Sequence, residues 1–162
     1  MDSSRIYIVG HSRGGAITLR TLDTLPDLGR AQEIKVAVVS GGVYASDLGL
    51  QTSAFKNMDN QQVIQCLMAS YNMSEADVIA LYRARSPDVP QNHDKIVTPI
   101  FIAQGTADTR VLPENAKRLA ADLAKMGVKY KLKFYPGAGH NFEEPQLSEF
   151  LRDCQAWFQE NS

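Results

Sequence analysis

Residues 6–22 of this chain read IYIVGHSRGGAITLRTL, and their pattern changes twice. It begins with four apolar residues, Ile6–Val9, which predict a short strand. A Gly-His-Ser-Arg-Gly turn follows, and from Arg13 to about Leu25 the spacing predicts a helix that Pro26 and Gly29 end. Its apolar side chains recur at helical spacing at Ala16, Ile17, Leu19 and Leu22. The stretch therefore predicts a strand, a tight turn and a helix in succession.

A Gly-x-Ser-x-Gly sequence between a strand and a helix is typical of a nucleophile elbow. Ser12 would then present its hydroxyl at the carboxyl end of the strand, and small residues at Gly10 and Gly14 would avoid clashes between strand and helix. The turn would also leave the backbone N–H of Arg13 free to face a developing oxyanion near the helix N-terminus. Because Gly and Ser are common in loops, an ordinary tight turn is the alternative.

Strand-like and helix-like runs alternate along the rest of the chain, which predicts an α/β fold with a mostly parallel sheet. Further strands are expected at Lys35–Ser40, Pro99–Gln104 and Lys129–Tyr135, the last as an edge strand that carries its lysines outward. Helices are expected at 113–126 and 145–159. The last helix is expected to bury one face made of Leu147, Phe150, Leu151, Cys154, Trp157 and Phe158.

Residues 43–95 are expected to form a helical excursion over the sheet edge. Two short helices are predicted there, at 60–70 and 74–85, and Ser74 caps the second with Asp77 in the capping-box position. The fold class predicted is thus a three-layer α/β/α sandwich, and residues 1–162 are expected to form a single domain.

Composition excludes several classes of partner. The chain has 162 residues and a net charge of −1, so no nucleic acid or acidic membrane surface is expected as a partner. No apolar run approaches the roughly 18 residues that span a bilayer, and the first residues lack a signal-peptide pattern. Cys66 and Cys154 are expected to be free thiols in a reducing, cytoplasmic compartment, and no cofactor or metal is expected.

A serine hydroxyl needs a base to take its proton and a carboxylate to orient that base. His140 lies in a Gly-rich loop directly after a strand and is the candidate base. His11 adjoins Ser12 and is expected to shape the pocket, whereas His93 is interpreted as a solvated loop residue. Asp108 follows another strand end and is the candidate acid, although alone it would more often be a turn cap. The chain order Ser12, Asp108, His140 is the order expected for such a site.

These residues resemble the α/β-hydrolase superfamily, in particular its prolyl-oligopeptidase-like branch (peptidase S9), which includes acylaminoacyl-peptidases, dipeptidyl-peptidases and related esterases. The matching stretches are RIYIVGHSRGGAIT (5–18), RSP (85–87), TPIFIAQGTADTRV (98–111) and YPGAGHNF (135–142). The resemblance implies Ser12 as nucleophile, Asp108 as triad acid, His140 as general base and the Arg13 N–H as an oxyanion-hole donor.

The same resemblance implies an eight-stranded sheet, of which this sequence has room only for the last four strands. We therefore expect the C-terminal half of the fold, without the loop that supplies the second oxyanion donor. Ile6–Val9 would expose an apolar strand edge, and such an edge invites pairing with another chain. A homo-oligomer is expected, with antiparallel pairing of two first strands about a two-fold axis as one geometry.

Two functions follow from these expectations. The first is a serine hydrolase that acts on small ester or acyl-peptide bonds through an acyl-enzyme. The second is a catalytically incomplete hydrolase remnant that serves as an assembly or binding module. A partial gene product, whose natural parent carries the missing strands, is a further possibility.

Overall fold

Four parallel strands form one sheet in the order β1–β2–β3–β4, which is also their order along the chain. They are β1 (Ile6–His11), β2 (Ile34–Ser40), β3 (Ile100–Gly105) and β4 (Tyr130–Tyr135). The structure, a computed structural model, describes residues 6–44, 65, 68–84 and 94–162. Because all four strands run the same way, their carboxyl ends lie at one edge of the sheet.

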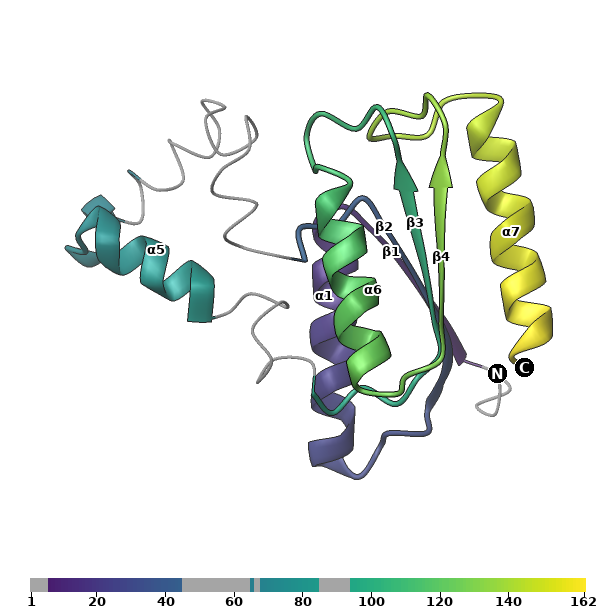
Figure 1. Ribbon diagram of the computed structural model, residues 1–162. Coiled ribbons are helices and arrows are strands. Elements are labelled where there is room, and N and C mark those ends of the chain that lie inside the picture. Colours follow the sequence, from purple (N-terminus) through teal and green to yellow (C-terminus); the bar gives the residue numbers. More distant parts are fainter. Residues whose placement is uncertain (1–5, 45–64, 66–67, 85–93) are drawn as a thin grey trace.

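Helices cover both faces of this sheet (Figure 1). Helices α1 (Arg13–Thr24) and α6 (Glu114–Lys125) lie on one face, and α7 (Gln146–Glu160) lies on the other. A 3-10 turn, η1 (Leu25–Leu28), follows α1 and ends at Gly29, whose φ is 70°. The predicted three-layer sandwich with a parallel sheet is confirmed.

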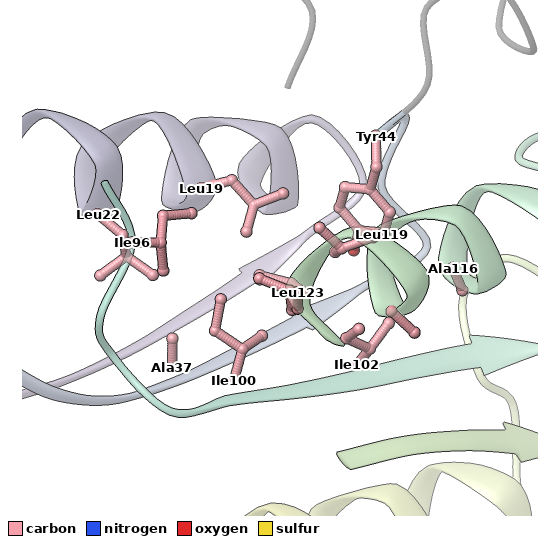
Figure 2. Packing of buried hydrophobic residues seen from close by; sticks show 12 residues of the cluster. Leu19, Leu22, Ala37, Tyr44, Ile96, Ile100, Ile102, Ala116, Leu119 and Leu123 are labelled. Carbon is pink, nitrogen blue, oxygen red and sulfur yellow. The ribbon is translucent and has the colours of Figure 1, made fainter. Parts of the chain in front are cut away.

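Each face of the sheet has its own hydrophobic core, because alternate strand residues point to opposite sides. Ala37 and Ile102 belong to the core beneath α1 and α6, where Figure 2 shows Leu19 and Leu123 packed over the strands. The core beneath α7 is made of Val36, Val38, Phe101, Ala103, Tyr135, Ala138, Phe142, Phe150, Cys154 and Trp157. β2 and β3 are therefore buried on both faces, as the continuous apolar character of residues 35–40 predicts for β2.

Two apolar helix residues are exposed, and one of them, Leu151, was expected on the buried face of its helix. Ile17 of α1 is 59% exposed and Leu151 of α7 is 57% exposed. The buried stripe of α1 contains Thr18, Leu19 and Leu22, so Ile17 lies beside it rather than on it. Leu151 likewise lies beside the buried positions of α7, because helical spacing places its side chain about 100° from that of Phe150. The predicted buried face of the last helix was therefore wrong at Leu151.

The helical excursion is described only in part. α5 (Glu75–Ala84) matches the second predicted helix, and residues 68–71 are helical where the first was expected. The capping box is confirmed, because the Asp77 N–H donates to Ser74 Oγ and the Ser74 N–H donates to Asp77 Oδ2, both at 3.1 Å. Residues 45–64, 66–67 and 85–93 lie outside the described residues. The rest of the predicted excursion, which includes most of the helix expected at 60–70, therefore stays a prediction.

β4 is an edge strand, as expected, but its lysines do not simply point into solvent. Lys133 Nζ lies 2.7 Å from Glu149 Oε1 and 2.6 Å from Asp153 Oδ2, both on α7. Tyr135 Oη donates to the same Asp153 oxygen at 2.7 Å. These bonds join the edge strand to the helix that covers it.

β1 forms the other edge, and no strand pairs with its outer side in the part of the chain that the structure describes. Val9 on this strand is 56% exposed. Across the described ranges, no helix is both long and apolar enough to cross a membrane.

Candidate active site

Ser12 lies on the turn between β1 and α1, with φ 54° and ψ −121°. A non-glycine residue in this left-handed region is strained, at a cost of about 1–3 kcal/mol. The Ser12 N–H donates to the carbonyl of Ser40, at the end of β2, at 2.8 Å. This bond ties the strained turn to the neighbouring strand.

The glycines around Ser12 have unequal roles. A Cβ on Gly10 would lie 2.3 Å from the Gly14 carbonyl oxygen and 2.4 Å from Thr18 Oγ1, so only glycine fits where β1 passes under α1. A Cβ on Gly14 would meet nothing within 4 Å apart from the nearby backbone of its own helix and its chain neighbours. The expectation that both positions must be small to avoid a clash was therefore wrong at Gly14, because the close approach is to its backbone oxygen.

We predict that Gly10→Ala lowers the free energy of unfolding by about 1–3 kcal/mol, the usual cost of overpacking. Gly14→Ala is expected to be neutral, or to stabilise α1 by up to about 1 kcal/mol, since alanine is the better helix former. Urea unfolding of the two variants beside the wild type measures both effects. Equal losses of stability in the two variants would contradict the close approach at Gly10.

Asp108 lies in the loop after β3 and is 3% exposed. Its Oδ1 accepts the backbone N–H groups of Arg110 and Val111, both at 2.9 Å. Its Oδ2 accepts Gln104 Nε2 at 3.1 Å and lies 2.8 Å from His140 Nδ1. The buried carboxylate thus has donors on both oxygens, as a charged group in this setting requires.

His140 reaches the site on the loop that follows β4. This loop passes directly over the end of β3, because a Cβ on Gly105 would lie 2.3 Å from the Ala138 carbonyl oxygen. The Ala107 N–H donates to that same oxygen at 2.9 Å, and the Gly137 N–H donates to Thr106 Oγ1 at 2.9 Å. The β3 and β4 loops are therefore bonded together, which brings His140 over the strand ends.

The three side chains that the sequence singles out lie in a row. Ser12 Oγ is 2.9 Å from His140 Nε2, and His140 Nδ1 is 2.8 Å from Asp108 Oδ2. In the neutral imidazole, an Nδ1–H that donates to Asp108 leaves Nε2 without a proton, so Nε2 can accept the Ser12 hydroxyl proton. The arrangement is suited to activating a serine for attack on a carbonyl.

Arg13 begins α1, so its N–H has no intrahelical carbonyl to which it can donate. It directly follows Ser12, at the positive end of the helix dipole. The role of this N–H in an oxyanion hole stays a prediction.

His11 lies beside His140, with the two ring centroids 4.9 Å apart. Its Nδ1 is 3.0 Å from Ser40 Oγ. Burial lowers the pKa of His11 below its ordinary value of 6.5, and the neighbouring His140 lowers that pKa further, although Asp108 and Ser40 oppose the shift. His93 lies outside the described residues.

This shift predicts a pH effect on folding. Since the folded-state pKa of His11 is lowered, the unfolded chain binds a proton more readily than the folded chain, and stability falls as pH drops through 6.5. His11→Phe removes the titration and keeps an aromatic ring. We expect the free energy of unfolding to fall less in His11→Phe than in the wild type between about pH 7.5 and about pH 5. Parallel curves from denaturant unfolding at each pH would contradict this prediction.

Two residues that hold the site were missed by the sequence analysis. Ser40 contacts both the Ser12 N–H and the His11 ring, and Gln104 donates to Asp108. The signal for Gln104 was a polar residue at the end of an otherwise apolar strand. Ser40 gave no comparable signal, because serine is common at strand ends.

The described residues hold no group of three or more His, Cys, Asp or Glu side chains suited to a metal ion. Cys154 is a free, buried thiol, and burial raises its pKa to about 12. Cys66 lies outside the described residues.

The fold is that of the α/β hydrolases, as its likeness to solved structures shows. An acylaminoacyl peptidase from Pyrococcus horikoshii superposes with a TM-score of 0.75 at 14% identity, over 99% of this chain and 24% of that chain. A puromycin-hydrolyzing peptidase from Mycobacterium tuberculosis superposes with a TM-score of 0.71 at 23% identity, over 99% of this chain and 22% of that chain.

The profile of the prolyl oligopeptidase family matches residues 1–162, and the chain belongs to this family. It is 23% identical over 162 residues to acylamino-acid-releasing enzyme 1 of Oryza sativa subsp. japonica, across 99% of this chain. It is 24% identical over 159 residues to an acylamino-acid-releasing enzyme of Arabidopsis thaliana, across 97% of this chain. The chain spans 20% of the length of each of these relatives. Membership in the family supports a serine hydrolase or peptidase kind of function.

Proposed function

We propose that this chain carries the catalytic centre of a serine hydrolase that acts on ester or acyl-peptide bonds. Ser12 is the nucleophile, His140 the general base, Asp108 the carboxylate that orients it, and the Arg13 N–H an oxyanion donor. The observation that carries the proposal is the unbroken row of hydrogen bonds from Ser12 Oγ through both His140 ring nitrogens to Asp108. The relatives' names add the acyl-peptide class of substrate.

The proposed reaction has two halves. Ser12 Oγ attacks the substrate carbonyl carbon while its proton passes to His140 Nε2, and Asp108 stabilises the imidazolium that forms. The carbonyl oxygen becomes an oxyanion that the Arg13 N–H can bind. Collapse of this intermediate breaks the ester or amide bond, and His140 gives its proton to the leaving group. A water molecule then attacks the acyl-enzyme with His140 again as base, which releases the acid and regenerates Ser12.

Labelling with a fluorophosphonate probe, beside turnover of a short-chain nitrophenyl ester, tests this proposal. We expect the folded wild-type chain to be labelled and to release nitrophenol, and pretreatment with the probe to abolish turnover. A folded chain that is neither labelled nor active would contradict it. That outcome would favour the alternative function, in which the chain is a catalytically incomplete module that assembles with other chains.

We also propose that copies of the chain pair through the outer edge of β1. The backbone N–H and C=O groups on that edge have no strand partner among the described residues, and exposed Val9 adds apolar surface beside them. Such an edge is a template for pairing with another strand. A two-fold antiparallel contact would join the two sheets into one.

Light scattering coupled to size exclusion tests this pairing. The wild type is expected to have twice the monomer mass at micromolar concentration. Val9→Lys is expected to shift it toward the monomer, because charged side chains on an edge disfavour pairing. Ile17→Lys, which adds the same charge at an exposed position of α1, is the matched control and is expected to leave the mass unchanged. A monomeric wild type would contradict the proposal.

A further inference from the structure

Gln104 is a fully buried polar residue at the end of β3, a strand in which every residue is buried. An apolar side chain would satisfy the same position without burying an amide. Moreover, the Gln104 Oε1 has no hydrogen-bond partner among the described residues. An unpaired buried acceptor is costly, so it calls for an explanation.

The nitrogen of the same amide, Gln104 Nε2, lies near three hydrogen-bond acceptors. Gln104 Nε2 lies 3.1 Å from the Val111 carbonyl oxygen, 3.3 Å from the Gly105 carbonyl oxygen and 3.1 Å from Asp108 Oδ2. All three neighbours are acceptors, so a rotated amide would direct Oε1 against three oxygens. The orientation of the amide is therefore determined by its surroundings, and its orphaned oxygen is the consequence.

One of these acceptors belongs to the row of side chains at the site. Asp108 Oδ2 receives Gln104 Nε2 and, at 2.8 Å, lies beside His140 Nδ1. The other oxygen, Oδ1, is held by the backbone N–H groups of Arg110 and Val111. Without Gln104, the His140 ring would be the only described group bonded to Oδ2, and the carboxylate could tilt about its Oδ1 anchors.

We propose that Gln104 is a positioning residue, which holds Asp108 Oδ2 where it accepts the His140 Nδ1–H. The inference rests on the function proposed above, since it assigns Gln104 a part in the same site. Because Gln104 is fully buried, we expect it to act through Asp108 and not by contact with substrate. Its effect should therefore appear in kcat rather than in KM, and should vanish when Asp108 can no longer act.

A double-mutant cycle tests this dependence. Gln104→Met, which keeps the length of the side chain, is expected to lower kcat for the nitrophenyl ester about 10–100-fold, the usual effect of losing a group that orients a site residue, with KM unchanged. In an Asp108→Asn background the same change is expected to lower kcat less than about two-fold, because residues that act as a unit are not additive. Equal losses in both backgrounds would overturn the proposal.

Leu123→Ala is the matched control for lost packing. Leu123 is a fully buried residue of α6 in the core between that helix and the sheet, and its apolar side chain offers Asp108 no hydrogen bond, so its truncation is expected to lower Tm through lost packing alone. Below Tm it is expected to leave kcat unchanged. If Gln104→Met lowers Tm as Leu123→Ala does and also leaves kcat unchanged, Gln104 is structural only and the proposal fails.

A second variant, Gln104→Glu, tests the same role through the dependence of its activity on pH. While protonated, its carboxyl can donate to Asp108 Oδ2; once ionised, it repels that carboxylate. We expect this variant to keep activity at low pH and to lose it as pH rises. Its plot of kcat against pH should therefore show a decrease toward high pH that the wild type lacks. A profile parallel to that of the wild type would count against the proposal.

Proton NMR gives a measurement that does not depend on turnover. The His140 Nδ1–H is expected to give a downfield resonance in the wild type, which moves upfield or broadens in Gln104→Met. An inactive wild type that still shows this change would refute the hydrolase function and keep the role of Gln104. An active wild type whose resonance is unchanged in Gln104→Met would refute the role of Gln104 alone.

Discussion

Ser12→Ala is expected to lower kcat for a short-chain nitrophenyl ester by about 10⁶-fold, because the row of hydrogen bonds then has no nucleophile to activate. His140→Ala is expected to cost about as much, since an unassisted serine hydroxyl is a poor nucleophile. The double variant should be hardly worse than either single one, because the two residues act as one unit. Initial rates, with circular dichroism to establish that each variant is folded, measure these effects.

Ser148→Ala is the matched control for the loss of a serine hydroxyl. Its Oγ donates to Glu144 Oε1 at 2.9 Å, on an exposed part of the chain. This variant is expected to keep wild-type kcat. If Ser12→Ala retained wild-type turnover, Ser12 would not be the nucleophile and the proposed mechanism would fall.

Asp108→Asn is the second change with a large expected effect, a loss of about 10⁴-fold in kcat. The asparagine oxygen can still accept the backbone N–H groups of Arg110 and Val111, so the loop after β3 should keep its shape. Its amide nitrogen would then face His140 Nδ1, where a donor favours the wrong imidazole tautomer. Ser12 would lose its base while the fold is kept, and steady-state kinetics together with the Tm would show this separation.

Asp153→Asn is the control for this substitution. Asp153 accepts Lys133 and Tyr135 at the contact of β4 with α7, away from the His140 hydrogen bonds. We expect it to lower stability and to leave kcat unchanged. If both substitutions lowered kcat alike, the orienting role of Asp108 would be refuted.

Much of the fold follows from the apolar pattern of the sequence. The largely apolar runs at residues 35–40 and 99–104 predicted two strands, and the two cores meet on the strands that form there. Ser12, Asp108 and His140 were placed at strand ends, and in a parallel sheet these ends share one edge. Proximity of the three residues could therefore be expected before any distance was known.

Other features depend on geometry that a linear pattern does not contain. Ile17 and Leu151 are apolar and close to the buried stripe of their helices, so only the rotation of each helix against the sheet shows that they are exposed. The motif predicted small residues at both 10 and 14, but the close contact is between residue 10 and the backbone carbonyl of Gly14, and residue types alone do not show which of the two glycines is needed. The part played by Gln104 depends on the direction of one amide.

Peptide mapping by mass spectrometry after fluorophosphonate treatment tests directly whether Ser12 is the nucleophile. We predict a single phosphonylated residue, Ser12, in the folded wild-type chain, and no adduct when the chain is unfolded before treatment. Labelling that is absent from the folded chain, or that falls on a serine other than Ser12, would contradict the account.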